Sequence, residues 1–259
     1  MRHWIACISA AIVATPIAAQ EGESEIDRER DRFLRPEAPI GTRFKQEPQT
    51  ASVSDARQMQ KRIAKCVYYA NKDDANALLA NSDFDRIDFD AIDTEADELF
   101  DKLDFGRCLG RAMKQSQYKV YATMRYDTLR NLLAEEAYLF NNKQAPTRDS
   151  NAPTLIEARF EGKTASPRTR VLAEVSDCIS YRNPQGAHEF LDTTPGTSGE
   201  TKAYEKIYGA LLTCLETDEA PDLDTTMVRM MIADGMWARS HYDAFVATPS
   251  DKSQPNDSQ

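Results

Sequence analysis

Two stretches of the chain share one pattern: KCVYYANKDDANALL at residues 65–79 and DCISYRNPQGAHEFL at residues 177–191. A cysteine, a tyrosine, an asparagine and an alanine recur at matching positions, beginning with Cys66 and Cys178. Apolar residues lie three and four positions apart before each cysteine, which is typical of an amphipathic helix. Each stretch therefore predicts a helix, with Asn71 or Asn183 as the N-cap of a second, short helix.

The recurrence continues further along the chain in the same order. Cys108-Leu109 matches Cys214-Leu215, and LRNLLAEEAY from Leu129 matches VRMMIADGMW from Val228. Each copy predicts four helices, the first of them capped by Ser54 in the first copy. The third and fourth helices are expected at about 95–114 and 117–140 in the first copy, and the fourth at about 225–247 in the second. The fold class expected is all-α, with two tandem four-helix repeat units.

Segments of different composition surround the two units. Residues 20–53 are rich in charge and poor in apolar side chains, which is typical of disorder. The expected ranges are 1–19 for a signal peptide, 20–53 for a disordered arm, 54–140 for the first unit, 141–168 for a linker, 169–247 for the second unit and 248–259 for a disordered tail.

The N-terminal residues MRHWIACISAAIVATPIAAQ have the features of a secretory signal peptide. Arg2 and His3 are basic, an apolar run follows from Trp4, and small residues end at Ala19. We expect cleavage near Ala19 and a periplasmic or secreted mature protein. No other segment is long and apolar enough to span a membrane.

Four cysteines remain after Cys7 is removed with the signal peptide. Their wide spacing is unlike the close Cys-x-x-Cys pairs of a zinc site, and an oxidising compartment favours disulfides. Four cysteines allow three pairings. The one that repeats in both units and closes each unit on itself is Cys66–Cys108 with Cys178–Cys214, one interhelix disulfide in each unit.

The composition excludes several classes of ligand. The formal net charge is −10, so phosphates of nucleic acid or of an anionic membrane would be repelled. Only 10 glycines and 3 histidines are present, which leaves little material for a phosphate loop or a histidine metal site. We therefore expect no cofactor.

Ionisable residues recur in both units, Arg130 with Arg229 and Glu135 with Asp234. Residues that occur in both copies are expected to serve the fold of the unit more than one active site. We expect ion pairs between helices, or with a helix C-terminus, at these positions.

An acidic run occurs once, in the first unit. Ten carboxylates lie between Asp83 and Asp104 against Arg86 and Lys102. Dense carboxylates can hold calcium, but the EF-hand glycine and final glutamate are missing. The interleaved apolar residues favour a segment that lies on the core with a solvated acidic face. The calcium candidates are Asp83, Asp85, Asp88 and Asp90.

Methionines cluster in the last expected helix at Met227, Met230 and Met231. Thioethers can bind Cu(I) in an exported protein, and helical spacing lets these three share a face. The same positions belong to the packing run of that helix, and methionine is a common core residue. Core packing is the favoured interpretation, and copper is the alternative.

Enzyme signatures are few. Ser116 and Lys119 fit the S-x-x-K pattern, but the companion motifs of serine acyl-enzymes are absent. His188 and His241 are the only histidines after the signal peptide, and neither has a recognisable partner in sequence. We expect a protein that is not an enzyme.

The pattern CV–N–A–LL, then CL, then R–LAE–Y resembles a family of exported bacterial proteins with cysteine-paired helical repeats and no established activity. The resemblance covers most of the mature chain and implies no catalytic residue. The second unit departs from the pattern at Gly235-Met236, where the first has Glu136-Ala137. We expect a protein-binding or envelope scaffold module with an unknown protein partner. The alternative is a periplasmic binder of a small molecule, calcium or copper.

Overall fold

The computed structural model describes residues 51–113, 124–146, 155–161, 165–217 and 223–246, and its regular elements there are all helical. They are α2 (Val53–Ala70), α3 (Lys72–Ala80), the 3-10 helix η1 (Asp90–Ile92), α4 (Leu99–Lys102), α5 (Phe105–Ala112), α6 (Tyr126–Asn141), α7 (Ile156–Phe160), α8 (Pro167–Arg182), α9 (Pro184–Asp192), α10 (Ser198–Cys214) and α11 (Thr225–Val246). The predicted all-α class is confirmed. Within these ranges no helix combines the length and apolar character needed to cross a bilayer. The expected signal peptide and tail lie outside the described residues, as does the expected arm up to residue 50.

Both expected disulfides are present. Cys66–Cys108 joins α2 to α5, and Cys178–Cys214 joins α8 to α10. Their Cα atoms lie 5.5 and 5.8 Å apart, within the ordinary range for a disulfide. The bonds close loops with sequence separations of 42 and 36 residues. In the chain-entropy model each disulfide restricts the unfolded chain and so stabilises the native state by about 4 kcal/mol.

The two asparagines of the recurring pattern make the same corner. Asn71 lies between α2 and α3 with φ −136° and ψ 54°, and Asn183 lies between α8 and α9 with φ −140° and ψ 64°. Each donates its backbone N–H to the carbonyl four residues earlier. Each also donates its side-chain amide to a later carbonyl, that of Leu103 or of Lys206. Only Asn183 caps the next helix with its side chain, by accepting from the N–H of Gly186.

The helix expected over about 95–114 is interrupted. Asp104 has φ 53°, a left-handed conformation that an α-helix of L-residues does not continue through, and it separates α4 from α5. In the C-terminal half, α10 runs for 17 residues without a break.

Three other boundaries differ from the expectations. Ser52, not Ser54, caps α2, because its hydroxyl accepts from Asp55 N–H, while Ser54 donates to the carbonyl of Gly196. The helix expected from 117 begins at Tyr126, after Arg125 in extended conformation, and residues 117–123 lie outside the described set. The range expected as a linker contains the short helix α7.

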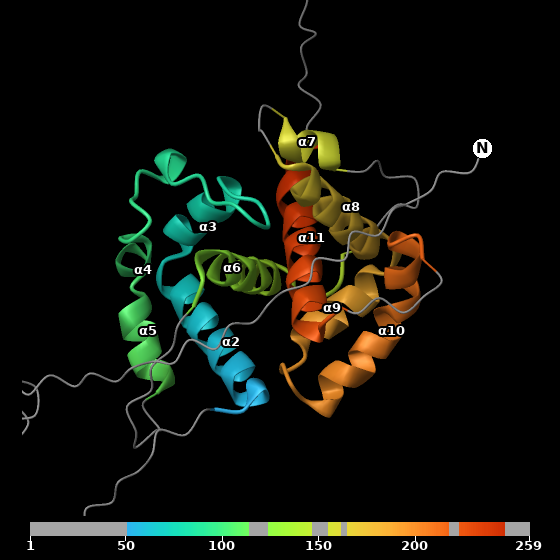
Figure 1. The fold of residues 1–259 in the computed structure, drawn as a ribbon, viewed down its shortest axis with the longest axis horizontal. Helices are drawn as coiled ribbons and strands as arrows, with labels where there is room; N and C mark the ends of the chain where they lie inside the picture. Colours follow the sequence, from blue (N-terminus) through green and yellow to red (C-terminus); the bar gives the residue numbers. More distant parts are fainter. Residues whose placement is uncertain (1–50, 114–123, 147–154, 162–164, 218–222, 247–259) are drawn as a thin grey trace, which may run out of the picture. The chain divides into compact units, whose positions relative to one another are not determined.

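The core is built around α6 and α11, which pack against each other (Figure 1). Helix α6 also packs on α2 and α3, and α11 packs on α8 and α9. Buried apolar side chains of all these helices form one continuous cluster, with Leu129 and Leu133 on α6 and Val228 and Ile232 on α11 fully buried. The two long central helices therefore join the N-terminal half (residues 53–141) to the C-terminal half (residues 156–246).

The departure from the recurring pattern at Gly235 has a packing cause. A Cβ atom at Gly235 would lie 2.4 Å from the backbone oxygen of Ser176 and 2.5 Å from the hydroxyl of Ser180. Glycine is therefore needed for α11 to approach α8 this closely. The matching residue on α6 is Glu136, which is 4% exposed.

Candidate functional site

The recurring ionisable residues form two ion pairs between the halves. Arg130 on α6 bonds to Asp234 on α11, and Arg229 on α11 bonds to Glu135 on α6 through two hydrogen bonds of 2.8 Å. The four side chains are at most 4% exposed. The prediction of ion pairs between helices is confirmed. The arrangement is reciprocal, because each arginine pairs with the carboxylate of the other half.

Arg229 also closes the end of α9. Its guanidinium donates to the carbonyls of Phe190, Leu191 and Thr193, which belong to the last turn of that helix or follow it. A cation at this position satisfies carbonyls that have no partner within the helix. Arg229 further bonds to Glu200 on α10, which Arg57 on α2 holds through two bonds of 2.7 and 2.9 Å.

Asp234 is neutralised by two arginines. Arg159 on α7 donates to Asp234 Oδ1 at 2.8 Å, beside Arg130 on the same oxygen. Burial by itself would raise the pKa of Asp234, but the charges and hydrogen bonds of Arg159 and Arg130 outweigh it and hold the pKa at about 2. The same balance applies to Glu135. Burial by itself would raise its pKa, but Arg229 and Lys61 outweigh burial, and the pKa is lowered. Both carboxylates are therefore charged and enclosed.

Glu136 is the exception in this buried cluster. Its Oε1 atom has no hydrogen-bond partner, and Lys61 Nζ lies 3.9 Å away while bonding to Glu135 and to the carbonyl of Leu191. Burial raises the pKa of Glu136 to about 7, and the attraction of Lys61 offsets only part of this rise. Glu136 is thus a buried carboxyl that titrates near neutral pH.

The acidic run uses its carboxylates for turns. Asp83 Oδ1 accepts from the backbone N–H groups of Asp85 and Arg86, and Asp88 Oδ1 accepts from Ala91 N–H at the start of η1. Asp85 and Asp90 are exposed. In the part of the chain that the structure describes, no group of three or more His, Cys, Asp or Glu residues could hold a metal ion. The four calcium candidates are not brought together as a ligand set.

The methionines of α11 lie against the core. Met231 is 2% exposed, and Met227 and Met230 are partly buried against the same apolar cluster. These positions agree with the core-packing interpretation. His188 accepts or donates a hydrogen bond with the hydroxyl of Tyr138 at 2.8 Å, and His241 stacks on Trp237. Ser116 and Lys119 lie outside the described residues.

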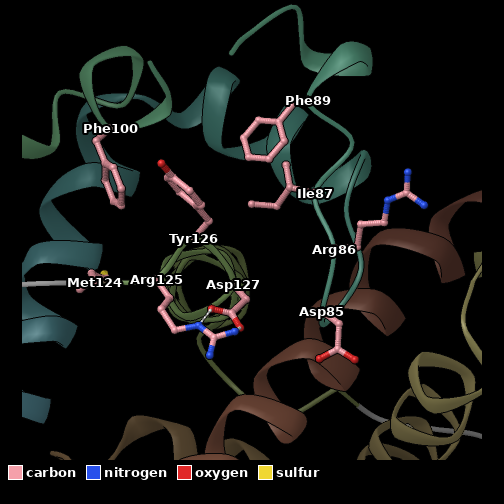
Figure 2. A pocket seen from close by; sticks show the side chains of 9 residues that line it. All are labelled: Asp85, Arg86, Ile87, Phe89, Phe100, Met124, Arg125, Tyr126 and Asp127. Atoms are coloured by element: carbon pink, nitrogen blue, oxygen red, sulfur yellow. Dashed lines mark hydrogen bonds and ion pairs between the residues drawn. The ribbon is translucent and has the colours of Figure 1, made fainter. Parts of the chain in front are cut away.

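A groove of about 540 Å³ lies beside the acidic run, between residues 85–89, α4 and the start of α6. Figure 2 shows Phe89 and Phe100 on opposite sides of Tyr126. The ring centroids are 5.8 Å apart for Phe89 and Tyr126, and 5.1 Å apart for Phe100 and Tyr126. The rings are half-buried. Ile87 and Met124 complete the apolar part of the lining.

The charged residues that line this aromatic groove balance one another. Arg125 bonds to Asp127 through contacts of 3.1 and 2.8 Å, with Arg125 81% exposed. Asp85 and Arg86 also line the groove (Figure 2), and Asp85 lies 3.7 Å from Arg168 on α8. The groove therefore combines apolar residues with charged residues of both signs, as in many protein ligand sites.

All residues that line the groove belong to the N-terminal half. Residues 81–98 connect α3 to α4 and supply Ile87 and Phe89, whereas five residues connect α9 to α10. The sequence singles out the acidic residues of this connection. The alternation of acidic and apolar residues in 83–92 is the signal that could have located the groove.

No family model, curated protein or solved structure matches this chain.

Proposed function

We propose that the chain is an exported, non-enzymatic protein that binds another protein through the aromatic groove. The single observation that carries the proposal is the cluster of Phe89, Phe100 and Tyr126, three half-buried rings that line a groove of about 540 Å³. Aromatic side chains are enriched in the centres of protein interfaces, where they bury large areas at small entropic cost.

Export is supported by the disulfides. Cys66–Cys108 and Cys178–Cys214 are bonds of a kind that persists in oxidising compartments and is rare in the cytosol. Together with the expected signal peptide, they favour a periplasmic or secreted protein. The mature chain is then expected to begin near Gln20.

A non-enzymatic role is supported by the state of the buried carboxylates. Glu135 and Asp234 have the partners that an acid or base would need, but both are enclosed and held ionised by buried arginines. A general acid or base needs a pKa near the working pH and access to substrate. Glu136 has a suitable pKa of about 7, but at 4% exposure between α2 and α6 it is closed to substrate. These observations favour a structural role for the cluster, in which it holds helices together.

We further propose that the chain is two tandem copies of one helical unit, at residues 54–140 and 169–247. Three observations support this: the matching corners at Asn71 and Asn183, the matching disulfides, and the reciprocal pairs between α6 and α11. Contacts in which residue i of one copy meets residue j of the other, and j meets i, are those that a two-fold axis generates. In this scheme the first copy carries the binding groove.

Photocross-linking in the native envelope tests the binding role. A benzoylphenylalanine replacing Phe100 should yield one or a few discrete protein adducts, because the group lies on the groove floor. The matched control replaces Tyr69, which is 47% exposed and lies on α2 outside the groove. Adducts from position 100 that also form from position 69, or no adducts at position 100, would contradict the proposed function.

A further inference from the structure

Three polar side chains on one face of α2 reach residues 191–200 of the C-terminal half. They occupy positions 54, 57 and 61, three and four residues apart, which places them on the same side of the helix. The contacts are Ser54 to the carbonyl of Gly196, Arg57 to the carboxylate of Glu200, and Lys61 to the carbonyl of Leu191 at 2.9 Å. These side chains therefore link α2 to the end of α9 and the start of α10.

Both groups that Lys61 bonds to have a second donor in Arg229. Glu135 accepts two hydrogen bonds of 2.8 Å from Arg229, and the carbonyl of Leu191 accepts another at 2.5 Å. The Lys61 side chain is 20% exposed, and its ammonium group is carried on a flexible four-carbon stem. Lys61 can therefore leave either acceptor without leaving it unpaired.

The acceptor next to Lys61 is Glu136. Its Oε1 atom lies 3.9 Å from Lys61 Nζ and has no hydrogen-bond partner. Two adjacent carboxyl groups, of Glu135 and Glu136, thus compete for one lysine. Glu135 has Arg229 as well, so an ionised Glu136 would be the less compensated of the two.

The charges that act on Glu136 come from three helices: Lys61 and Lys65 on α2, Glu135 on α6 and Arg229 on α11. Two further helices, α3 and α9, pack on α6. Their ionisable groups nearest in contact with α6 have other partners there, since Lys72 lies over the ring of Phe140 and His188 bonds to the hydroxyl of Tyr138. Lys61 is therefore the cation placed to answer a charge on Glu136.

We propose that Lys61 changes partner with the protonation state of Glu136, and that this exchange makes the link between α2 and α9 sensitive to pH. While Glu136 keeps its proton, Lys61 stays on Glu135 and on the carbonyl of Leu191. When Glu136 loses its proton to solvent, a buried carboxylate without a hydrogen bond is left, which is costly. Lys61 then turns to Glu136 Oε1 and releases Leu191, whose carbonyl keeps its bond from Arg229.

The exchange falls near neutral pH. Burial raises the pKa of Glu136 to about 7, and the attraction of Lys61 offsets part of this rise. Below this pH all three contacts of α2 with residues 191–200 are made. Above it the contacts of Ser54 and Arg57 remain, and that of Lys61 is lost. The end of α9 is therefore held less firmly to α2 at alkaline pH.

Nuclear magnetic resonance of the full mature protein, labelled with ¹³C and ¹⁵N and with its disulfides intact, tests the proposal. Three signals are followed from pH 5 to 9: the carboxyl carbon of Glu136, the Nζ atom of Lys61 and the carbonyl carbon of Leu191. We expect all three to shift with one common midpoint near pH 7. A purely structural ion pair would leave the Lys61 and Leu191 signals in place.

Variants separate the exchange from a general effect of pH. In Glu136→Gln the Lys61 and Leu191 signals should lose their shift near pH 7. In Lys61→Met the Leu191 signal should lose it too, while Glu136 still titrates at a higher midpoint, because a cation that lowers its pKa is gone. The matched control is Lys65→Met, one turn further along α2. It should keep the Leu191 shift, with at most a small rise in midpoint.

Several results would overturn the proposal. One is a Glu136 signal that titrates while those of Lys61 and Leu191 stay in place. Another is a Leu191 shift that persists in Glu136→Gln, which would assign it to a different group. A Glu136 that does not titrate between pH 5 and 9 would overturn it as well. If Lys61→Met does not fold, the original protein and Glu136→Gln decide the question.

Discussion

Replacing Glu136 by glutamine should stabilise the protein at pH 8. Glu136 is 4% exposed, its Oε1 atom has no hydrogen-bond partner, and its nearest cation, Lys61, is already bonded to Glu135. Ionising this carboxyl therefore puts a poorly compensated charge between α2 and α6. A neutral amide of the same size avoids that charge and keeps the packing.

The magnitude follows from the pKa. Burial raises the pKa of Glu136 from 4.5 to about 7, so the native state holds its proton more tightly than the unfolded state does. Stability from this group is fully present below pH 4.5 and is lost as the pH rises to about 7. At about 1.36 kcal/mol for each pH unit, the loss is about 3 kcal/mol. Asp234, with a pKa of about 2, titrates outside this window.

Urea unfolding at several pH values between 4.5 and 8 measures the effect. The free energy of unfolding of the original protein should fall across this range, while that of Glu136→Gln should stay nearly level. The variant should be more stable by up to about 3 kcal/mol at pH 8 and similar at pH 4.5. Glu174→Gln, at an exposed position on α8, is the control and should follow the original curve. Parallel curves for Glu136→Gln and the original protein would refute the reasoning.

Two further substitutions test the packing of α11. Asp234→Asn should lower the free energy of unfolding by about 3–5 kcal/mol, because it leaves two buried arginines without a counter-charge. Arg125→Gln removes an ion pair whose arginine is 81% exposed, and it should cost less than about 1 kcal/mol. Equal losses of stability in the two variants would argue against a buried ion pair at Asp234. Gly235→Ala should cost about 1–3 kcal/mol through the clash with Ser176, whereas Gly209→Ala on α10, where a Cβ meets nothing within 4 Å, should stabilise by about 0.5–1 kcal/mol. The melting temperatures of the two glycine variants measure these effects. A Gly235→Ala variant as stable as the original protein would mean that α8 and α11 lie further apart than described.

The helices and disulfides could be predicted because their signals are local or recur in the sequence. Apolar spacing marks α2 and α8, and the cysteines recur with this pattern, so the pairing could be inferred from the recurrence. For Arg130 and Arg229 the sequence predicts that ion pairs form, but not with which carboxylates. Their partners lie in the opposite half, and no spacing along the chain shows which half an arginine reaches.

The groove could not be predicted, since residues 85–89, Phe100 and residues 124–127 meet only in the folded chain. Phe100 packs partly against the core and also lies beside Tyr126. The break between α4 and α5 could not be predicted either, because it depends on the left-handed conformation of Asp104. Aspartate visits that region more readily than most residues, but its presence in a helical pattern does not require it. Glu136 was visible only as a departure from the recurring pattern. Its unusual pKa comes from burial between helices that the sequence does not place.

The proposed two-unit architecture and the proposed export both draw support from the disulfides. Peptide mapping of the mature protein without reductant, on material from its native compartment, tests this connectivity most directly. The account predicts two linked peptide pairs, Cys66 with Cys108 and Cys178 with Cys214. A link between the halves, such as Cys66 with Cys178, or four free thiols, would contradict it.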